Sequence, residues 1–407
     1  MWRLGTFFHE MAYGLLTVFV PMYIVATVTS GGLGGSLVDL GIITALAVVS
    51  TIPAAYFWGW ICDRIRRYKV FILLAFLSMA VILFLFTLSF AQNLWVFAAL
   101  YILMNVLHIA HEPPKNVLVA ENYSHDKWGR AYAIYEGVTE FGLIIGLGIG
   151  FFTFTATLNF GVNAILCFYI CSALSLAAFV FSLLFVADPI MNIERRLVGM
   201  ERTLDYAHRG FETVAKMWQG CRDPPDLKPP RFLGFGLAIL VFTLAAGIFY
   251  TPLPVFFTSY MGLDAGSVFV VYVLGSIGST SGYFFIRNRA YGGDAKKRIS
   301  RMILLRTMLV ALIVTVVSLS FYPLVVTGLL LIGMGFVFAV YSILMLCNSM
   351  ALVPQGKAGI IDVLTGLGTA VGSFLGPYLA EVIGYLPAYA ISAVLFLVAF
   401  VCIKVFS

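Results

Sequence analysis

Charged residues are scarce in this sequence. Asp, Glu, Lys and Arg make up 11% of its 407 residues, whereas hydrophobic residues make up 61%. Soluble domains carry roughly 25% charged residues, which they show to water. The shortage of charge excludes an ordinary soluble protein and favours a chain that is surrounded by lipid.

Sequence patterns that would mark an enzyme, a cofactor site or a metal site are lacking as well. The sequence contains no HExxH, GxSxG or phosphate-binding P-loop pattern, and its six cysteines include no CxxC pair. The neighbours His111 and Glu112 do not by themselves make a zinc motif. We therefore expect no catalytic residue, no cofactor and no metal site. The net charge of +6 lies in short runs between apolar segments, so no nucleic-acid partner is expected.

What the chain does contain is a series of long apolar runs. Crossing a hydrocarbon core about 30 Å thick takes about 20 apolar residues of helix, whereas a membrane barrel strand needs only about 10 alternating residues. Twelve runs reach the helical length, at residues 5–28, 37–61, 70–91, 94–120, 131–156, 162–187, 232–258, 264–287, 302–320, 324–349, 358–381 and 386–405. The sequence therefore predicts an all-α membrane protein with twelve transmembrane helices in a lipid bilayer.

The basic residues indicate how the chain is oriented. Lys and Arg cluster in every second loop, as in Arg67 and Lys69 after the second span and Lys127 and Arg130 before the fifth. The loops between these contain no Lys or Arg. Because cations stay on the cytoplasmic side, both termini are expected there, in a multi-pass protein of the cell (plasma) membrane.

A long polar segment, residues 188–231, divides the chain into two halves of six spans. Its apolar residues recur at intervals of three and four, which predicts a cytoplasmic linker with an amphipathic helix. Residues 1–187 and 232–407 are therefore expected to form two six-helix bundles. Asp39-Leu40-Gly41 and Asp264-Ala265-Gly266 begin equivalent spans, which indicates that the two bundles are homologous.

The turn between spans two and three carries the most specific motif. Gly59, Asp63, Arg64 and Arg67 lie there in a basic cluster, with Arg66 at a position that a second glycine usually takes. This motif, the two halves and the long central loop together resemble the major facilitator superfamily over the whole chain. The resemblance implies a secondary transporter in which Asp63 and Arg64 lock the cytoplasmic ends of the halves.

We therefore expect a conformational gate made of Gly59, Asp63, Arg64, Arg67 and Arg130. Independently of the resemblance, a carboxylate at the end of a membrane helix is stable only beside cations or a helix N-terminus, and Arg130 is an available partner. The alternative is a plain basic turn that sets the topology.

A run of glycines marks span five, with Gly142, Gly146, Gly148 and Gly150. It resembles the glycine-rich motif of the superfamily's exporters, without the proline that usually follows the second glycine, and it favours export slightly over import. The alternative is close packing alone, since small residues four apart let helices approach each other.

Ionisable residues inside the predicted spans are the candidates for the functional site. A charge at mid-bilayer costs roughly 2.5–3.5 kcal/mol on insertion scales, so each one needs a partner or a function. Span four carries a polar stripe at intervals of three or four residues, beside Pro113 and Pro114, which should kink this helix and leave the carbonyls near Ile109 and Ala110 without intrahelical partners. The polar residues of span one include His9. The candidates for proton coupling or substrate binding are Glu10, His108, His111, Glu112, Lys115, Glu136 and Glu140.

The charges of these candidates do not balance. Four carboxylates share the one lysine, so at least one acid is expected to carry a proton, and such a group could couple transport to protons. His108 and His111 could relay protons, or could simply be satisfied by hydrogen bonds. For Glu112 and Glu136 the alternative is structural pairing with Lys115.

A less charged wall is expected opposite this stripe. The cavity-wall candidates are Tyr13, Asn105, Tyr250, Tyr341 and Asn348. In the second half, Asp362 and Arg306 could pair with each other. A cavity with one ionisable side and one aromatic side would suit an amphipathic or cationic small-molecule solute.

The leading hypothesis is thus a monomeric, proton-coupled secondary active transporter that works by alternating access. One alternative is a facilitator that does not use protons. Another is a membrane receptor or scaffold that keeps the fold without transporting, although the charged groups inside the membrane disfavour it.

Overall fold

The structure is a computed structural model that describes residues 3–65, 67–115, 118, 128–155, 159–188, 230–288, 294–319, 323–352 and 359–406. Every regular element in these ranges is helical, and twelve helices are long and apolar enough to span a membrane. The predicted all-α class and the twelve spans are confirmed. The amphipathic helix predicted within 188–231 lies outside the described residues, apart from residues 188, 230 and 231 at its ends.

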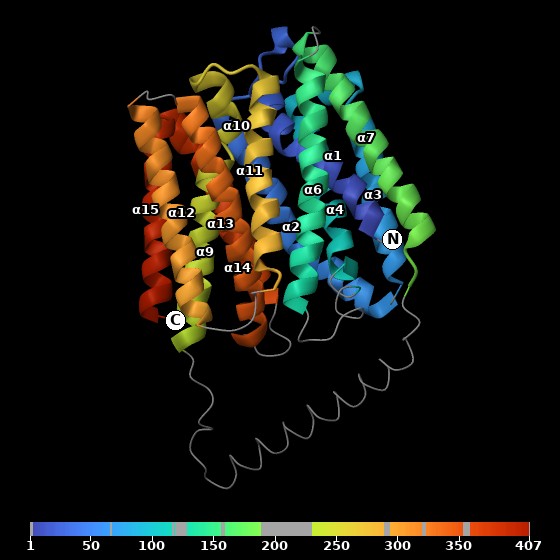
Figure 1. Cartoon of the computed structure of the whole chain (residues 1–407). Helices are drawn as coiled ribbons and strands as arrows, with labels where there is room; N and C mark the ends of the chain where they lie inside the picture. Colours follow the sequence, from blue (N-terminus) through green and yellow to red (C-terminus); the bar gives the residue numbers. More distant parts are fainter. Residues whose placement is uncertain are drawn as a thin grey trace.

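The long helices follow the apolar runs closely (Figure 1). In the first half they are α1 (Arg3–Val25), α2 (Leu37–Ile65), α3 (Tyr68–Leu85), α4 (Leu94–His108), α6 (Trp128–Thr155) and α7 (Phe160–Phe185). In the second half they are α9 (Pro230–Tyr250), α11 (Ala265–Ile286), α12 (Ala295–Ser318), α13 (Pro323–Leu352), α14 (Gly359–Val382) and α15 (Tyr385–Phe406).

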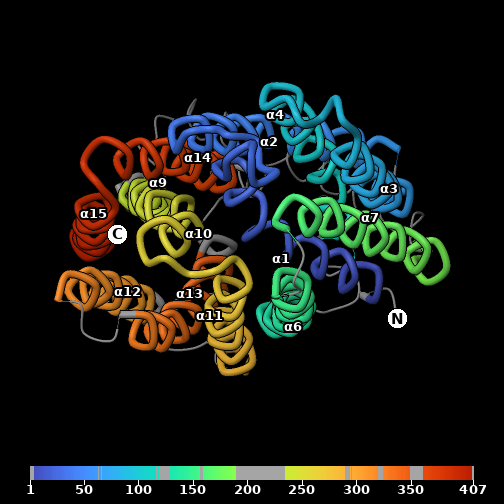
Figure 2. The backbone as a smooth tube through the Cα atoms, turned by 90° about the horizontal axis from the view of Figure 1, so that it is seen from above, coloured from blue at the N-terminus to red at the C-terminus, as the bar shows by residue number. Residues whose placement is uncertain are grey.

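The helices form two groups that meet along the middle of the molecule (Figure 2). Within the first group α1 packs on α6 and α7, and within the second α9 packs on α14 and α15. The two groups meet where α2 lies on α14 and α6 lies on α11. Glycines permit the closest approaches, since a Cβ on Gly41 of α2 would stand 3.0 Å from the carbonyl oxygen of Phe374 in α14.

Several contacts hold the two groups together at the end where α2 begins and α14 ends. The Val38 N–H donates to Glu381 Oε2 at 2.9 Å, and the Thr44 hydroxyl lies 3.5 Å from the Ser373 carbonyl oxygen. Phe154 stacks on Phe269 between α6 and α11, with ring centroids 5.5 Å apart. The two halves are therefore joined at this end, which the sequence predicts to face away from the cytoplasm.

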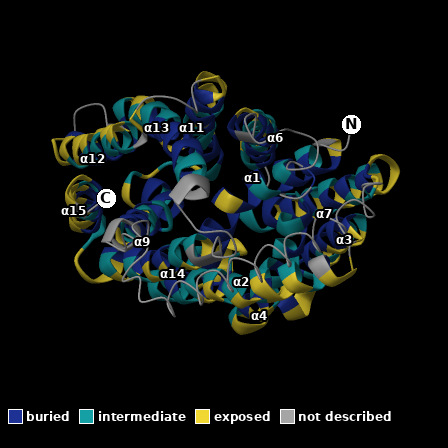
Figure 3. Ribbon diagram, turned by 90° about the horizontal axis from the view of Figure 1, so that it is seen from below, coloured by how far each residue is buried: buried dark blue, intermediate teal, exposed yellow. Residues whose placement is uncertain are grey.

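Large apolar side chains cover the outward faces of the bundle. Exposed residues gather on the outer sides of helices such as α4, α12 and α15 (Figure 3). Phe152, Leu184 and Val394 are examples, with 74%, 68% and 60% of their surface exposed. A face of this kind needs lipid rather than water beside it.

Two helices are interrupted where prolines lie. After α4 the chain makes the 3-10 turn η3 (Ile109–His111) and then continues as helix over residues 112–115, at Pro113 and Pro114. The predicted span 232–258 is broken too, because α9 ends at Tyr250 and the chain continues through α10 (Leu253–Val255) and the π-helical turn η5 (Phe256–Tyr260). Such interruptions are tolerated in a membrane where protein or water satisfies the freed backbone groups.

Candidate functional site

The break after α4 determines where the polar residues of this helix point. Pro113 has no N–H for the Ile109 carbonyl, but the Glu112 N–H bonds to that carbonyl through the tighter 3-10 turn. The expectation that the Ile109 carbonyl would lack an intrahelical partner is therefore wrong. Two side chains bond to other backbone carbonyls at the break. His111 Nδ1 lies 2.6 Å from the His108 carbonyl oxygen, and Trp58 Nε1 donates to the Val106 carbonyl at 2.8 Å.

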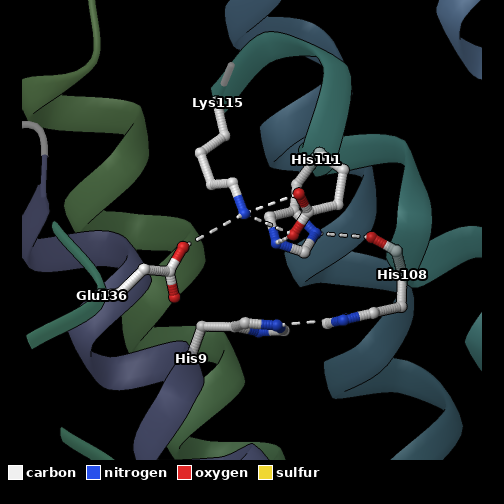
Figure 4. Close-up of polar contacts among 6 residues, drawn as sticks. His9, His108, His111, Lys115 and Glu136 are labelled. Atoms are coloured by element: carbon white, nitrogen blue, oxygen red, sulfur yellow. Dashed lines mark hydrogen bonds and ion pairs between the residues drawn. The ribbon is translucent and has the colours of Figure 1, made fainter. Parts of the chain in front are cut away.

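Three histidine rings meet beside this break (Figure 4). His9 of α1 faces His108 of α4, with His9 Nε2 and His108 Nδ1 3.0 Å apart. The His111 ring stands at a steep angle to both, with centroids 5.2 Å from His9 and 4.7 Å from His108. Phe76 stacks on His9 at 4.5 Å and Tyr13 stacks on His108 at 5.3 Å, so the aromatic rings fix the orientation of the imidazoles.

His9 belongs to this histidine cluster, although no sequence pattern marks it as a candidate. Its ring is fully buried, and its Nδ1 finds no hydrogen-bond partner among the described residues. His108 could be recognised as a candidate because the polar residues of α4 recur at helical spacing along one face. His9 joins that stripe only through the packing of α1, and no spacing in the sequence encodes this contact.

Lys115 connects the acids of two helices (Figure 4). Its Nζ lies 2.7 Å from Oε1 and 2.6 Å from Oε2 of Glu112, and 4.0 Å from Oε1 of Glu136 in α6. The Tyr135 ring lies 5.6 Å from the same ammonium group. Glu112 also approaches His111, with Oε1 3.4 Å from Nε2, so the lysine network and the histidine cluster share this carboxylate.

The remaining acids surround this network. Glu10 of α1 lies within electrostatic range of Glu136, Lys115 and Glu112. Glu140, one turn beyond Glu136, lies near Ser276 and Ser279 of α11 and so reaches the second half. Asp362 of α14 is exposed and interacts with Glu112 and Lys115 across the two halves.

Access to the network is uneven. The side chains of Glu112 and Glu136 are each 34% exposed, whereas that of Lys115 is 15% exposed and that of His111 only 5%. The two carboxylates are therefore partly open, while His9 and His111 are buried and His108 is partly exposed. A small cavity adjoins His111 and Lys115 and is also lined by Thr6, Tyr135 and Val186.

The expected wall residues are dispersed. Tyr13 stacks on His108, and Asn105 donates its Nδ2 to the Tyr101 carbonyl at 2.8 Å in the same helix. Asn348 near the end of α13 is partly exposed. Tyr341, in contrast, is 6% exposed and stacks on Phe242 at 3.9 Å, which places it in the core of the second half rather than on a wall.

The sequence suggests that Arg306 could pair with Asp362, but the structure shows no such ion pair between these two residues. The Arg306 side chain is fully buried and donates to the Met334 carbonyl at 3.3 Å. The rings of Phe242, Tyr250, Phe338 and Phe396 surround the guanidinium, with centroids 5.2–5.6 Å away. Tyr250 thus belongs to this aromatic cage, which stabilises the cation by contact with the ring faces.

The expected gate residues lie at the ends of α2, α3 and α6. Arg64 stands over the Trp60 ring at 5.5 Å, Arg67 precedes α3, and Arg130 is exposed on the first turns of α6. A Cβ added to Gly59 would meet nothing within 4 Å, so close packing does not require a glycine there. The side chain of Asp63 lies outside the described part of the structure, and so does its expected contact with Arg130.

Comparison with known proteins identifies the class of protein that this fold and this intramembrane network define. The sequence model of the Major Facilitator Superfamily matches residues 4–361. The chain therefore belongs to this superfamily and is a multi-pass membrane transporter, not an enzyme.

Among its relatives are proteins named multidrug resistance protein MdtG. The chain is 25% identical to that of Serratia proteamaculans over 321 residues, which are 78% of this chain and 70% of the relative. It is 28% identical to that of Yersinia enterocolitica over 193 residues, 47% of this chain and 44% of the relative.

Solved structures share the fold at low identity. A POT family transporter in complex with 5-aminolevulinic acid is similar with a TM-score of 0.72 and 14% identity, over 100% of this chain and 95% of that one. The human organic anion transporter MFSD10 (TETRAN) has a TM-score of 0.68 and 14% identity, over 99% of this chain and 97% of the other.

Proposed function

We propose that this chain is a proton-coupled exporter of amphipathic or cationic small molecules, with Glu112, Lys115 and Glu136 at its coupling site. The observation that carries the proposal is the charge imbalance around Lys115. One ammonium group contacts Glu112 closely and Glu136 at 4.0 Å, with Glu10 and Glu140 nearby. When no cation neutralises a carboxylate inside a membrane, that carboxylate is a functional candidate by default.

Glu136 is held less closely by Lys115 than Glu112 is, which leaves it available to a proton or a cationic solute. Its side chain is one-third exposed, and its only described ion pair is the long one with Lys115. Glu112, with both oxygens within 2.7 Å of Nζ, stays paired unless a proton replaces the lysine. Protonation of Glu112 would release Lys115 toward Glu136 and displace a bound cation. This exchange couples proton binding to solute release.

Two features favour export, namely the glycine run of α6 and the name of the MdtG relatives, multidrug resistance proteins. The two halves are joined at the end predicted to face outside, through contacts such as the one between Val38 and Glu381, so in this state the carboxylates would be reached from the cytoplasm. Residues 1–187 and 232–407 would be the two rocking bundles, with both termini cytoplasmic and Asp63, Arg64 and Arg130 at the cytoplasmic gate.

The test is the movement of a fluorescent lipophilic cation, such as ethidium, into proteoliposomes under a pH gradient. We expect Glu112→Gln and Glu136→Gln each to lower the gradient-driven accumulation of the cation at least tenfold, because each substitution removes a carboxylate that takes part in the coupling. Asp294→Asn is the matched control, because Asp294 caps α12 through an oxygen that asparagine keeps. Gradient-driven accumulation that survives both glutamate variants would overturn the site. Transport that never responds to the gradient would indicate a facilitator.

A further inference from the structure

A second site lies next to the carboxylates. His9, His108 and His111 each offer one ring nitrogen, and these three atoms all lie within 4.8 Å of one another. Two nitrogens bound to one zinc ion at about 2.0–2.1 Å stand roughly 3.3 Å apart in tetrahedral geometry. The 3.0 Å separation of His9 Nε2 and His108 Nδ1 is close to that value. Rotation of the rings would have to shorten the longest of these separations toward about 3.3 Å.

From this geometry we propose that His9, His108 and His111 bind a divalent transition-metal ion such as Zn²⁺ or Co²⁺. The proposal does not depend on proton coupling, although the two sites adjoin at Glu112. Three neutral imidazoles are a common donor set for these ions and can leave a fourth position open. Glu112 Oε1, 3.4 Å from His111 Nε2, stands where it could fill that position.

The protonation pattern of the cluster fits a metal site. His111 Nδ1 lies 2.6 Å from the His108 carbonyl oxygen, which can only accept, so Nδ1 carries the hydrogen and Nε2 keeps its lone pair. Backbone hydrogen bonds of this kind orient most metal-binding histidines. Metal binding would replace the hydrogen bond between His9 Nε2 and His108 Nδ1, and the hydrogens of these two rings would then lie on His9 Nδ1 and His108 Nε2.

The surrounding charge also favours a divalent cation. The groups that face the cluster are Glu112 and Lys115 from the segment after α4, Glu136 from α6 and Glu10 from α1. Three carboxylates against one ammonium group leave negative charge to be balanced. A divalent ion on neutral imidazoles supplies the missing positive charge, whereas the ammonium of Lys115 stays with the carboxylates.

The experiment uses the full chain, purified without a histidine tag and placed in lipid nanodiscs. Co²⁺ is titrated alone, followed by its absorption spectrum, and Zn²⁺ is then added as a competitor. We expect one Co²⁺ per chain, displaced by Zn²⁺. His9→Gln, His108→Gln and His111→Gln should each weaken binding at least about tenfold, since even outer groups of a metal site contribute 10–100-fold.

The double variant Cys167→Ala/Cys171→Ala is the control, because thiols also bind these metals and both cysteines are buried in α7. Its affinity for Co²⁺ should equal that of the wild type. X-ray absorption of the wild-type Zn²⁺ complex gives a second readout that needs no variant, and it should show about three imidazole ligands. Three results would each overturn the proposal: no stoichiometric binding of Co²⁺, binding that persists in all three histidine variants, or sulfur ligands at the metal.

Discussion

His9 of α1 and His108 of α4 share a ring-to-ring hydrogen bond across two helices, with His9 Nε2 and His108 Nδ1 3.0 Å apart. The bond lies directly behind the carboxylates of Glu112 and Glu136, and Phe76 and Tyr13 cover it on either side. It links α1 to α4, while α1 itself packs mainly on α6 and α7.

This hydrogen bond should be measurable as a coupling energy. In a double-mutant cycle with His9→Ala and His108→Ala, we expect a coupling of about 0.6 kcal/mol, the average for hydrogen bonds between membrane helices, and at most about 1.7 kcal/mol. The measurement is reversible unfolding of the protein in mixed micelles. Strictly additive effects would show that the two rings are neighbours without a stabilising bond.

The charge balance around Lys115 predicts a rescue. Lys115→Met should destabilise the protein, because it leaves the carboxylates of Glu112 and Glu136 without their cation, but by less than the about 3–5 kcal/mol of a fully buried pair, since both side chains are 34% exposed. Lys115→Met combined with Glu112→Gln should recover much of that loss. Thermal unfolding in detergent compares the two, and a double variant less stable than the single one would contradict the pairing.

Gly146 and Gly148 of α6 make a matched pair. A Cβ on Gly146 would collide with the carbonyl oxygen of Met11 in α1, whereas a Cβ on Gly148 would meet nothing within 4 Å. Gly146→Ala should therefore separate α1 from α6 and lower the unfolding temperature, and Gly148→Ala should leave it unchanged or slightly raised. Equal effects of the two substitutions would contradict the close approach of α1 and α6.

Asp264 caps α11 outside the membrane spans. It accepts from the Ser267 N–H at 2.9 Å and from the Ser267 hydroxyl at 2.6 Å. These bonds, the hydroxyl first, hold the pKa of Asp264 below its ordinary value. Because the pKa is lowered on folding, the carboxylate stabilises the protein above its ordinary pKa, and this contribution is lost as the pH falls through the folded-state pKa.

Asp264→Ala should thus lower the free energy of unfolding by about 1 kcal/mol near neutral pH. The difference from the wild type should shrink as the pH falls below the ordinary pKa of about 3.9. Unfolding temperatures of the wild type and the variant, measured near neutral pH and again below the ordinary pKa of Asp264, test this. Asp264→Asn serves as the control, since an amide oxygen caps the helix independently of pH. If the stability difference between the wild type and Asp264→Ala grew in acid, the prediction would be wrong.

The sequence predicts most of the fold because each span must be apolar over a fixed length. The second span was expected at 37–61 and α2 covers Leu37–Ile65; the last was expected at 386–405 and α15 covers Tyr385–Phe406. The error is larger at the ninth span, where α12 begins at Ala295 rather than 302. Asp294 caps that helix by accepting from the Lys297 N–H, and a basic first turn extends it beyond the apolar run.

The candidate site was predictable only in part. Glu112 and Lys115 lie three residues apart, so their ion pair follows from helical spacing. The approach of Glu136 and His9 depends on how α6 and α1 pack against the segment after α4, which residue spacing does not encode. Arg306 shows the same limit, since only the packing of α9, α13 and α15 reveals its aromatic cage.

Solute-dependent proton movement across liposomes tests the central claim most directly. A pH-sensitive dye inside the vesicles records protons while the lipophilic cation is added. The account predicts a proton flux opposite to the solute in the wild type and in Asp294→Asn, and its loss in both Glu112→Gln and Glu136→Gln. A solute-dependent proton flux of wild-type size in both glutamate variants would contradict it.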